Sequence, residues 1–293
     1  MHIRPLESTT LDDALALCRS TLEWDPFAPR VLEEKLFGGD AGRPSLVLGA
    51  YDQGALVGLL AGAGRWIKLL MVAREHRRRG VGTALLAEMV AWAQLGARLR
   101  AADHPGNYLT PGIDPRYQDG RGFLLARGFV EVGQVPNLRV RLRDNQRATR
   151  AHAIELERPC ATAGYKVRRA AAADGRALDQ MVTAAFSRAQ AWEIARALEV
   201  GGVHIALDDG GALAAFAAHD GNNRGLGWFG PAGTLPQHQR RGLGECLLVH
   251  CLADVAERGQ DETIIAWVGP IEFYRRAVGA EIERTFTQWE RPA

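Results

Sequence analysis

The sequence has few cysteines, no long hydrophobic run and almost no excess of either charge. Four cysteines in 293 residues, none in a CxxC pair, argue against a disulfide framework and against a structural zinc site. No apolar run reaches 18 residues, so no transmembrane helix is expected, and the first residues lack the apolar segment of a secretory signal. We therefore expect a cytoplasmic protein with reduced thiols, no metal site and no membrane association.

The charges nearly cancel, because 36 Lys and Arg residues face 34 Asp and Glu residues. A basic cluster surrounds Arg77, but a net charge of +2 does not favour nucleic acid as a partner. Hydrophobic residues make up 47% of the chain, which excludes an intrinsically disordered protein. At roughly 150 residues per domain, the length predicts about two globular domains.

A tandem repeat runs through the sequence. The segment 77–86 is echoed by 239–248, 162 residues later, and the segment 52–56 is echoed by 209–213. Such self-similarity at long range indicates a duplicated domain rather than two unrelated ones.

The spacing between the copies changes along the chain. It falls from 162 residues at the repeated glycine segment to 150 at Phe123 and Phe273. The first copy therefore carries twelve extra residues, which lie within the turn-rich segment 104–122. We predict two domains of one fold, 1–158 and 159–293, and a lid or acceptor-site wall in the extra segment.

Both copies show the same predicted order of elements. A strand, two helical stretches and a hairpin come first, then another strand, a glycine turn and an amphipathic helix, and finally a strand, a short helix and a strand. This order predicts an α/β fold (α+β, mixed sheet) in each domain. The clearest segments are the helices 11–22, 30–36, 174–186 and 192–200, the hairpins 45–51/55–61 and 203–207/212–218, and the strands 66–72 and 226–235.

The glycine turn is the segment whose residues most directly indicate a binding function. It reads Arg-x-x-Gly-x-Gly at 77–82 and Gln-x-x-Gly-x-Gly at 239–244. The first amides of a helix have no intrahelical partner and carry positive partial charge, so they bind anions. Glycines let the backbone approach a phosphate. Neither turn has the lysine of a Walker A loop or the third glycine of a Rossmann fingerprint.

The repeated turn resembles the acyl-CoA motif of the GNAT (Gcn5-related) N-acetyltransferases, Gln/Arg-x-x-Gly-x-Gly/Ala between a strand and a helix. A later motif of that family, Phe-Tyr-x-x-x-Gly-Phe, is similar to 123–129 and to 273–280. The resemblance covers nearly the whole chain. It implies two tandem GNAT-like acyl-CoA-binding domains, acetyl-CoA as the cofactor and a small-molecule amine as the acceptor. No nucleic acid is expected as a partner, and the protein is expected to be a monomer or a homodimer.

The same resemblance implies where CoA would bind. The pyrophosphate would lie on the amides of the two turns, and the pantetheine would run beside the ends of the preceding strands. The implied cofactor-binding residues are Leu70, Met71, Val72, Arg77, Arg78, Arg79, Gly80, Val81, Gly82, Thr83, Thr234, Leu235, Gln239, Arg240, Arg241, Gly242, Leu243, Gly244 and Glu245.

The two copies differ at the position of the family's catalytic tyrosine. Tyr274 stands there in the second copy and is expected to protonate the leaving thiolate, whereas the first copy has Leu124. We therefore expect the chemistry in the second copy. Neither strand before the turns contains a carboxylate, which leaves His204, His219 or a chain of waters as the base.

Residues of the first copy are candidates for the acceptor site. They belong to the helix region that lines this site in the family or to the extra segment: Glu23, Asp25, Asn107, Tyr108 and Tyr117. Because a carboxylate base is missing, a second hypothesis stays open. In it, the protein is a regulatory acyl-CoA-binding protein or pseudoenzyme in which one or both copies are not catalytic.

Overall fold

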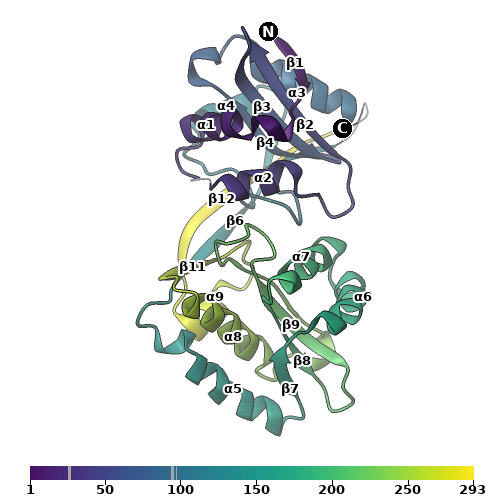
Figure 1. The fold of residues 1–293 in the computed structure, drawn as a ribbon, viewed down its shortest axis with the longest axis vertical. Coiled ribbons are helices and arrows are strands. Elements are labelled where there is room, and N and C mark those ends of the chain that lie inside the picture. The colour runs from purple at the N-terminus through teal and green to yellow at the C-terminus, as the bar shows by residue number, and fades with distance from the viewer. Residues whose placement is uncertain (26–27, 94–95, 97) are drawn as a thin grey trace. The chain divides into compact units, whose positions relative to one another are not determined.

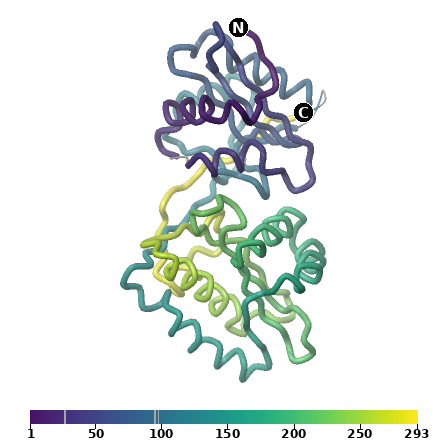
Figure 2. The backbone as a smooth tube through the Cα atoms, viewed as in Figure 1, coloured from purple at the N-terminus to yellow at the C-terminus, as the bar shows by residue number. Residues whose placement is uncertain are grey.

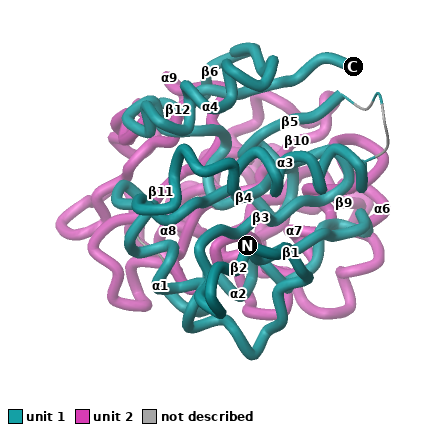
Figure 3. Tube along the Cα trace, turned by 90° about the horizontal axis from the view of Figure 1, so that it is seen from above, with its two compact units in different colours: residues 1–135, 285–293 teal, residues 136–284 magenta. Residues whose placement is uncertain are grey.

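The structure is a computed structural model, and it describes every residue except 26–27, 94–95 and 97. The chain forms two compact units (Figure 3). Unit 1 contains residues 1–135 and 285–293, and unit 2 contains residues 136–284. The same division is seen along the backbone trace, where the yellow C-terminal end of the chain belongs with the purple N-terminal residues (Figure 2).

Unit 1 is a twisted mixed sheet with helices on both faces (Figure 1). Its strand order is β1-β2-β3-β4-β5-β12-β6, with β4 and β5 parallel and β1 to β4 antiparallel. Its elements are β1 (His2–Pro5), α1 (Leu11–Thr21), α2 (Pro29–Phe37), β2 (Ser45–Asp52), β3 (Ala55–Ala63), β4 (Trp66–Val72), α3 (Val81–Trp92), β5 (Leu99–Ala101), α4 (Gln118–Leu125), and the parts of β6 (Val130–Arg141) and β12 (Glu281–Arg291) that lie within it.

Unit 2 repeats this arrangement. Its strand order is β7-β8-β9-β10-β11-β6-β12, and β10 and β11 are its parallel pair. Its elements are α5 (Arg150–Thr162), β7 (Lys166–Arg169), α6 (Gly175–Ala185), α7 (Arg188–Glu199), β8 (Val203–Leu207), β9 (Leu213–His219), β10 (Phe229–Thr234), α8 (Leu243–Glu257), β11 (Glu262–Ile265) and α9 (Ile271–Val278), with the remaining parts of β6 and β12.

Alternation along the central strands builds the two cores of unit 1. On β3, Leu59 and Ala61 face the core formed with α1 and α2, while Leu60 faces the core formed with α3 and α4. Val57 also joins the second core, because a register shift against β2 interrupts the alternation at this residue. Successive side chains of a strand point to opposite faces, so an apolar strand can bury both faces beneath helices. The sheet is thereby fixed between two helical layers, and the loops at its edge are left to carry function.

The predicted α/β fold class is confirmed, and the predicted helices and hairpins lie close to their expected positions. One strand is shorter than expected. The strand predicted over 226–235 begins at Phe229, because the carboxylate of Asp220 accepts hydrogen bonds from the amides of Gly225 and Gly227 at 3.0 and 2.8 Å and holds the preceding residues in a turn. Helix α5 is not among the elements predicted from the sequence.

The C-terminal strand completes the unit that contains the N-terminus. Trp289 of β12 pairs with Ala101 of β5, and its side chain is 1% exposed within the α3–α4 core of unit 1. The compact units thus divide the chain at other positions than the duplication, whose boundary between residues 158 and 159 stays a prediction. Among the residues that the structure describes, no helix is both long and apolar enough to span a membrane.

Replacing Trp289 by alanine is expected to destabilise unit 1 by about 3–5 kcal/mol, because a fully buried indole leaves a large cavity in the core. Urea unfolding followed by circular dichroism measures the change. The control is Leu125→Ala on α4, where the side chain is 51% exposed and the cost should stay below about 1 kcal/mol. Equal effects of the two substitutions would contradict the assigned role of the C-terminal strand.

Candidate functional site

The two glycine turns have the same backbone conformation. Arg78 and Gly80 have φ angles of 62° and 85°, and α3 begins at Val81. In the second turn, Arg240 and Gly242 have φ angles of 61° and 79°, just before α8. Turns of this kind aim successive N–H groups into one concavity at the positive end of a helix, which suits a phosphate.

The glycines of the first turn serve different purposes. A Cβ added to Gly80 would meet no atom within 4 Å, so its left-handed conformation requires glycine while the space beside it stays open. A Cβ on Gly82 would lie 3.2 Å from the ring of Phe123 on α4, so this glycine permits close helix packing. Gly244 faces Phe273 of α9 in the same way, at 3.7 Å.

One strand precedes each glycine turn, and its parallel neighbour follows the helix after the turn. The two strands pair only briefly before they diverge, and we call this divergence the fork. β4 pairs with β5 at Trp66–Arg100 and Ile67–Ala101, and the pairing found in the described residues goes no further. β10 pairs with β11 at Phe229–Ile265. The cofactor residues expected on the first of these strands, Leu70 to Val72, lie on the part of β4 beyond the fork.

The arginines of the first turn have different environments. Arg77 donates from Nε to the carbonyl of Val72 at 3.2 Å and from a terminal nitrogen to Asp119 at 2.8 Å, so it ties the strand end to the start of α4. Arg78 and Arg79 are exposed, as are Arg240 and Arg241 of the second turn. Thr83, on the first turn of α3, accepts a hydrogen bond from Arg127 at 2.5 Å.

Tyr274 lies on α9 against the fork of the second copy. Its ring packs edge-on against Phe229 of β10 and Phe273, with ring centroids 6.1 and 4.9 Å apart. Burial raises the pKa of Tyr274 to about 12, so the phenol is protonated at neutral pH and can donate a proton. In the first copy Leu124 is 4% exposed and belongs to the α3–α4 core.

The structure brings together Asp25 and Tyr117 among the candidate acceptor residues. The Tyr117 hydroxyl donates to Asp25 Oδ2 at 2.9 Å and accepts a hydrogen bond from the amide of Trp24 at 3.1 Å. Glu23 pairs instead with Arg74, at 2.9 Å on the surface. The extra segment therefore contacts the loop after α1. The carboxylate of Asp25 is already hydrogen-bonded to Tyr117, and that of Glu23 is already paired with Arg74.

Asn107 and Tyr108 are buried parts of the segment that follows β5. Asn107 donates to the carbonyls of Glu34 and Gly39, each at 2.8 Å, and accepts from Lys35 at 3.0 Å. These contacts fix the segment to α2, so Asn107 positions the chain. Tyr108 is 9% exposed.

His204 and His219 lie in unit 2 at the side of α8, away from the turn. Both imidazoles contact Asp254, at 2.8 and 3.3 Å, and this carboxylate also pairs with Arg150 and Arg169. Asp254 stands eleven residues after the start of α8, about 16 Å along the helix at 1.5 Å per residue. The ion-pair network accounts for both imidazoles without a substrate.

A buried polar cluster at the fork of the first copy was missed by the sequence reasoning. Lys68 of β4 pairs with Asp40 at 2.5 Å, and Nδ1 of His104 lies 4.0 Å from the same carboxylate. All three side chains are at most 6% exposed. A lysine within the apolar strand Trp66–Val72 and a histidine just after β5 were the signals that the sequence offered.

The surroundings of His104 keep its imidazole neutral. Burial lowers its pKa to about 3, and the positive charges of Lys68, Arg43 and Lys35 act in the same direction. The ring meets Trp66 edge-on, with centroids 5.7 Å apart. Among the residues that the structure describes, neither ring nitrogen has a hydrogen-bond partner.

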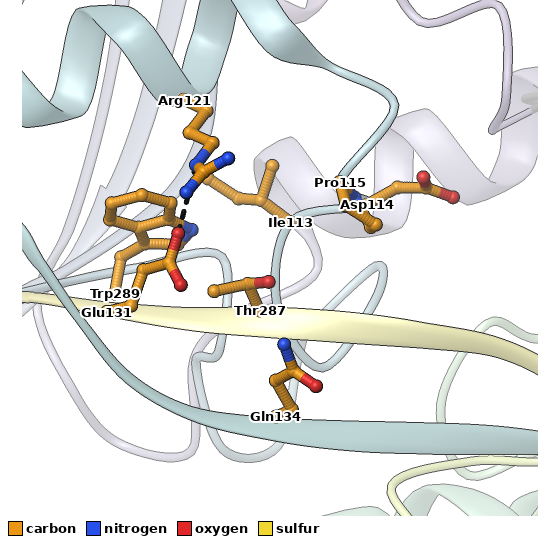
Figure 4. Close-up of a pocket in the computed structure, with 8 residues that line it drawn as sticks. All are labelled: Ile113, Asp114, Pro115, Arg121, Glu131, Gln134, Thr287 and Trp289. Carbon is orange, nitrogen blue, oxygen red and sulfur yellow. Dashed lines mark ion pairs between the residues drawn. The ribbon is translucent and has the colours of Figure 1, made fainter.

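A small pocket of about 130 Å³ lies elsewhere in unit 1, beside the ion pair of Arg121 and Glu131 (Figure 4). Ile113, Asp114 and Pro115 of the extra segment line one side of it, and Thr287 and Trp289 of β12 line another, with Gln134 from β6. Sites for drug-sized ligands measure roughly 300–1,000 Å³, so this pocket is too small for acyl-CoA.

Comparison with known proteins agrees with this geometry. Residues 12–106 match the acetyltransferase (GNAT) family. This match lies within the first copy. No curated protein matches the chain significantly.

Solved structures extend the likeness to the whole chain. A tandem GNAT protein from the clavulanic acid biosynthesis pathway has a TM-score of 0.67 and 20% identity, covering 99% of this chain and 98% of its own. A GCN5-related N-acetyltransferase from Sphaerobacter thermophilus has a TM-score of 0.68 and 16% identity, covering 99% and 95%.

A further match is the GCN5-related glucosamine N-acetyltransferase region of a fungal multi-domain β-N-acetylglucosaminidase. Its TM-score is 0.80 at 18% identity, and this chain spans 38% of that protein. These likenesses show that the whole chain has the tandem GNAT fold, which confirms the predicted resemblance. Family and fold support acyl-CoA-dependent acetyl transfer in general terms.

The neutral His104 predicts a loss of stability in acid. Its folded pKa lies below the unfolded value of 6.5, so stability is present above pH 6.5 and is lost as the pH falls toward the folded pKa. Between pH 6.5 and 4, the loss should be on the order of 3 kcal/mol.

Urea unfolding of the wild type and of His104→Asn at several pH values measures this loss. The variant should be less sensitive to acid, because asparagine does not titrate. His152→Asn on α5 serves as the control and should follow the wild type. A pH dependence unchanged by His104→Asn would refute the assignment of a neutral buried imidazole.

Proposed function

We propose that the protein is an N-acetyltransferase that moves the acetyl group of acetyl-CoA to a primary amine of a small molecule. The observation that carries the proposal is the pair of turns with one backbone conformation, each at a helix N-terminus and each beside a fork of parallel strands. The GNAT family match of residues 12–106 supports the same activity. We also propose the cytoplasm as its location.

The residues present fit acetyl-CoA as the donor. The open space beside Gly80 and the exposed arginines that follow Arg77 suit a pyrophosphate. The edge of β4 beyond the fork suits the amide groups of pantetheine. In the second copy the turn 239–245 also has exposed arginines before a helix, and a Cβ on Gly242 would lie 4.0 Å from Cys160 Sγ of α5.

In the second copy we assign proton donation to Tyr274. As the amine nitrogen bonds to the acetyl carbon, the C–S bond breaks and the sulfur leaves as a thiolate. The phenol is protonated at neutral pH and lies against the fork, so it is suited to protonate that thiolate. Of the described residues on β10 none is ionisable, so the amine must arrive uncharged or lose its proton to water.

A second candidate is a protein that holds acyl-CoA without turnover. Leu124 favours it for the first copy, because a buried leucine replaces the tyrosine there. Calorimetry with acetyl-CoA and release of free thiol in the presence of a panel of amines separate the two functions. Turnover supports the transferase, binding without turnover supports the second candidate, and no binding contradicts both.

The turn glycines predict the affinity for acetyl-CoA. Gly80→Ala and Gly242→Ala should each weaken binding at their own site roughly tenfold or more, because alanine disfavours the left-handed conformation that aims the amides.

Glycines of the hairpin turns provide matched controls for these two variants. Gly54 and Gly211 have φ angles of 87° and 78°, and a Cβ on either would meet nothing within 4 Å. Gly54→Ala and Gly211→Ala should therefore cost similar stability and leave the calorimetric affinity unchanged. If Gly54→Ala and Gly211→Ala weaken acetyl-CoA binding as much as Gly80→Ala and Gly242→Ala do, the glycine turns are not the CoA-binding sites.

Tyr274→Phe should lower kcat roughly tenfold or more and leave the KM for acetyl-CoA nearly unchanged, because it removes the proton donor and keeps the ring. Steady-state kinetics with the best amine of the panel measures both constants. Tyr51→Phe, a buried tyrosine of β2 in unit 1, is the control and should keep the wild-type rate. A wild-type kcat in Tyr274→Phe would end the assignment.

A further inference from the structure

The forks of the two copies differ in their polar groups. In the first copy Lys68 and His104 stand where β4 and β5 separate. The equivalent positions of the second copy hold Gly230 and Val268, which cannot exchange a proton through a side chain. The two copies therefore share a fold but differ in the side chains at the fork, which are polar in the first copy and apolar or absent in the second.

The cluster lies on the face of the sheet that α2 covers. Lys68 contacts Asp40, which follows α2, and Asn107 ties the segment after β5 to the carbonyl of Glu34 on α2. His104 is thus held beside the strand edge on which the proposed function places the pantetheine, at the end of the fork where the strands are joined.

His104 is the group in this cluster whose hydrogen-bonding capacity is unused. It is fully buried, and neither ring nitrogen has a partner among the described residues, while Lys68 is paired with Asp40. A buried polar group without a partner costs about 1–3 kcal/mol. A ligand that supplies an N–H or an acceptor to the imidazole would remove this cost.

We propose that His104 makes the first copy a second reaction site, in which the neutral imidazole accepts a hydrogen bond from an uncharged acceptor amine and positions it. This inference rests on the proposed function. The nitrogen of the amine forms a bond to the acetyl carbon while the C–S bond breaks. The proton released by the nitrogen passes to the departing thiolate, so no further reactant is needed.

The charges around His104 select the form of the acceptor. Lys68, Arg43 and Lys35 lower its pKa, which shows that the field at the ring is positive. A cationic amine is disfavoured in such a field, whereas an uncharged amine, or one that also carries a carboxylate, is favoured. The carboxylate of Asp40 is paired with Lys68, so it does not offset this field at the ring.

The test uses the full-length protein with the Tyr274→Phe substitution, which lowers the contribution of the second copy. In this background His104→Val, which copies the second fork, should lower the remaining kcat/KM for the amine at least tenfold. His104→Gln keeps a hydrogen-bond acceptor at this position, so it should restore most of the kcat/KM that His104→Val loses. The affinity of both variants for acetyl-CoA, measured by calorimetry, should be unchanged and shows that the unit is folded.

The outcomes separate this inference from the proposed function. If the wild type binds acetyl-CoA but acetylates no amine, the transferase activity fails and this inference fails with it. If the wild type turns over and both His104 variants keep the rate of the Tyr274→Phe protein while binding acetyl-CoA normally, the second reaction site alone is refuted. The cluster is then a buried structural group.

Discussion

The separation of two parallel strands is the constraint on which the rest of each unit depends. β4 and β5 stay paired for only a few residues, and β10 and β11 do the same. Where a strand loses its neighbour, its backbone N–H and C=O groups need another partner. Helices on both faces fix the direction in which the strands diverge, and the glycine turn then sets the N-terminus of a helix beside the opening. Sheet, turn and helix dipole thus converge at one place in each unit.

Much of the fold could be predicted from the sequence, because its strands, hairpins and glycine turns depend on patterns that extend over only a few residues. Alternating apolar residues, polar-glycine hairpin turns and the Arg-x-x-Gly-x-Gly pattern act within a few residues, and the fold they predicted is confirmed. The functional contacts were less accessible. The proximity of Lys68, Asp40 and His104 depends on segments far apart in the chain, and so does the bond between Tyr117 and Asp25. No periodicity encodes such contacts.

The copies have diverged more in side chains than in backbone. Their turns agree within a few degrees at the positive-φ residues, yet one copy holds a half-buried phenol and the other a buried imidazole. Backbone conformation is set by glycine and helix geometry, which tolerate few changes, whereas a side chain at the fork can change without loss of the fold. Duplication followed by divergence at such positions permits two chemistries on one scaffold.

The position of β12 in the sequence affects the order in which the two units can complete their folding during synthesis. Residues 285–293 complete the sheet of unit 1, and Trp289 fills its core. A ribosome delivers these residues after all of unit 2 has been synthesised. Domains of many chains fold one after another from the N-terminus as they emerge. Here unit 1 lacks part of its core until residues 285–293 have been made, so during that interval it is more exposed to misfolding and to chaperones.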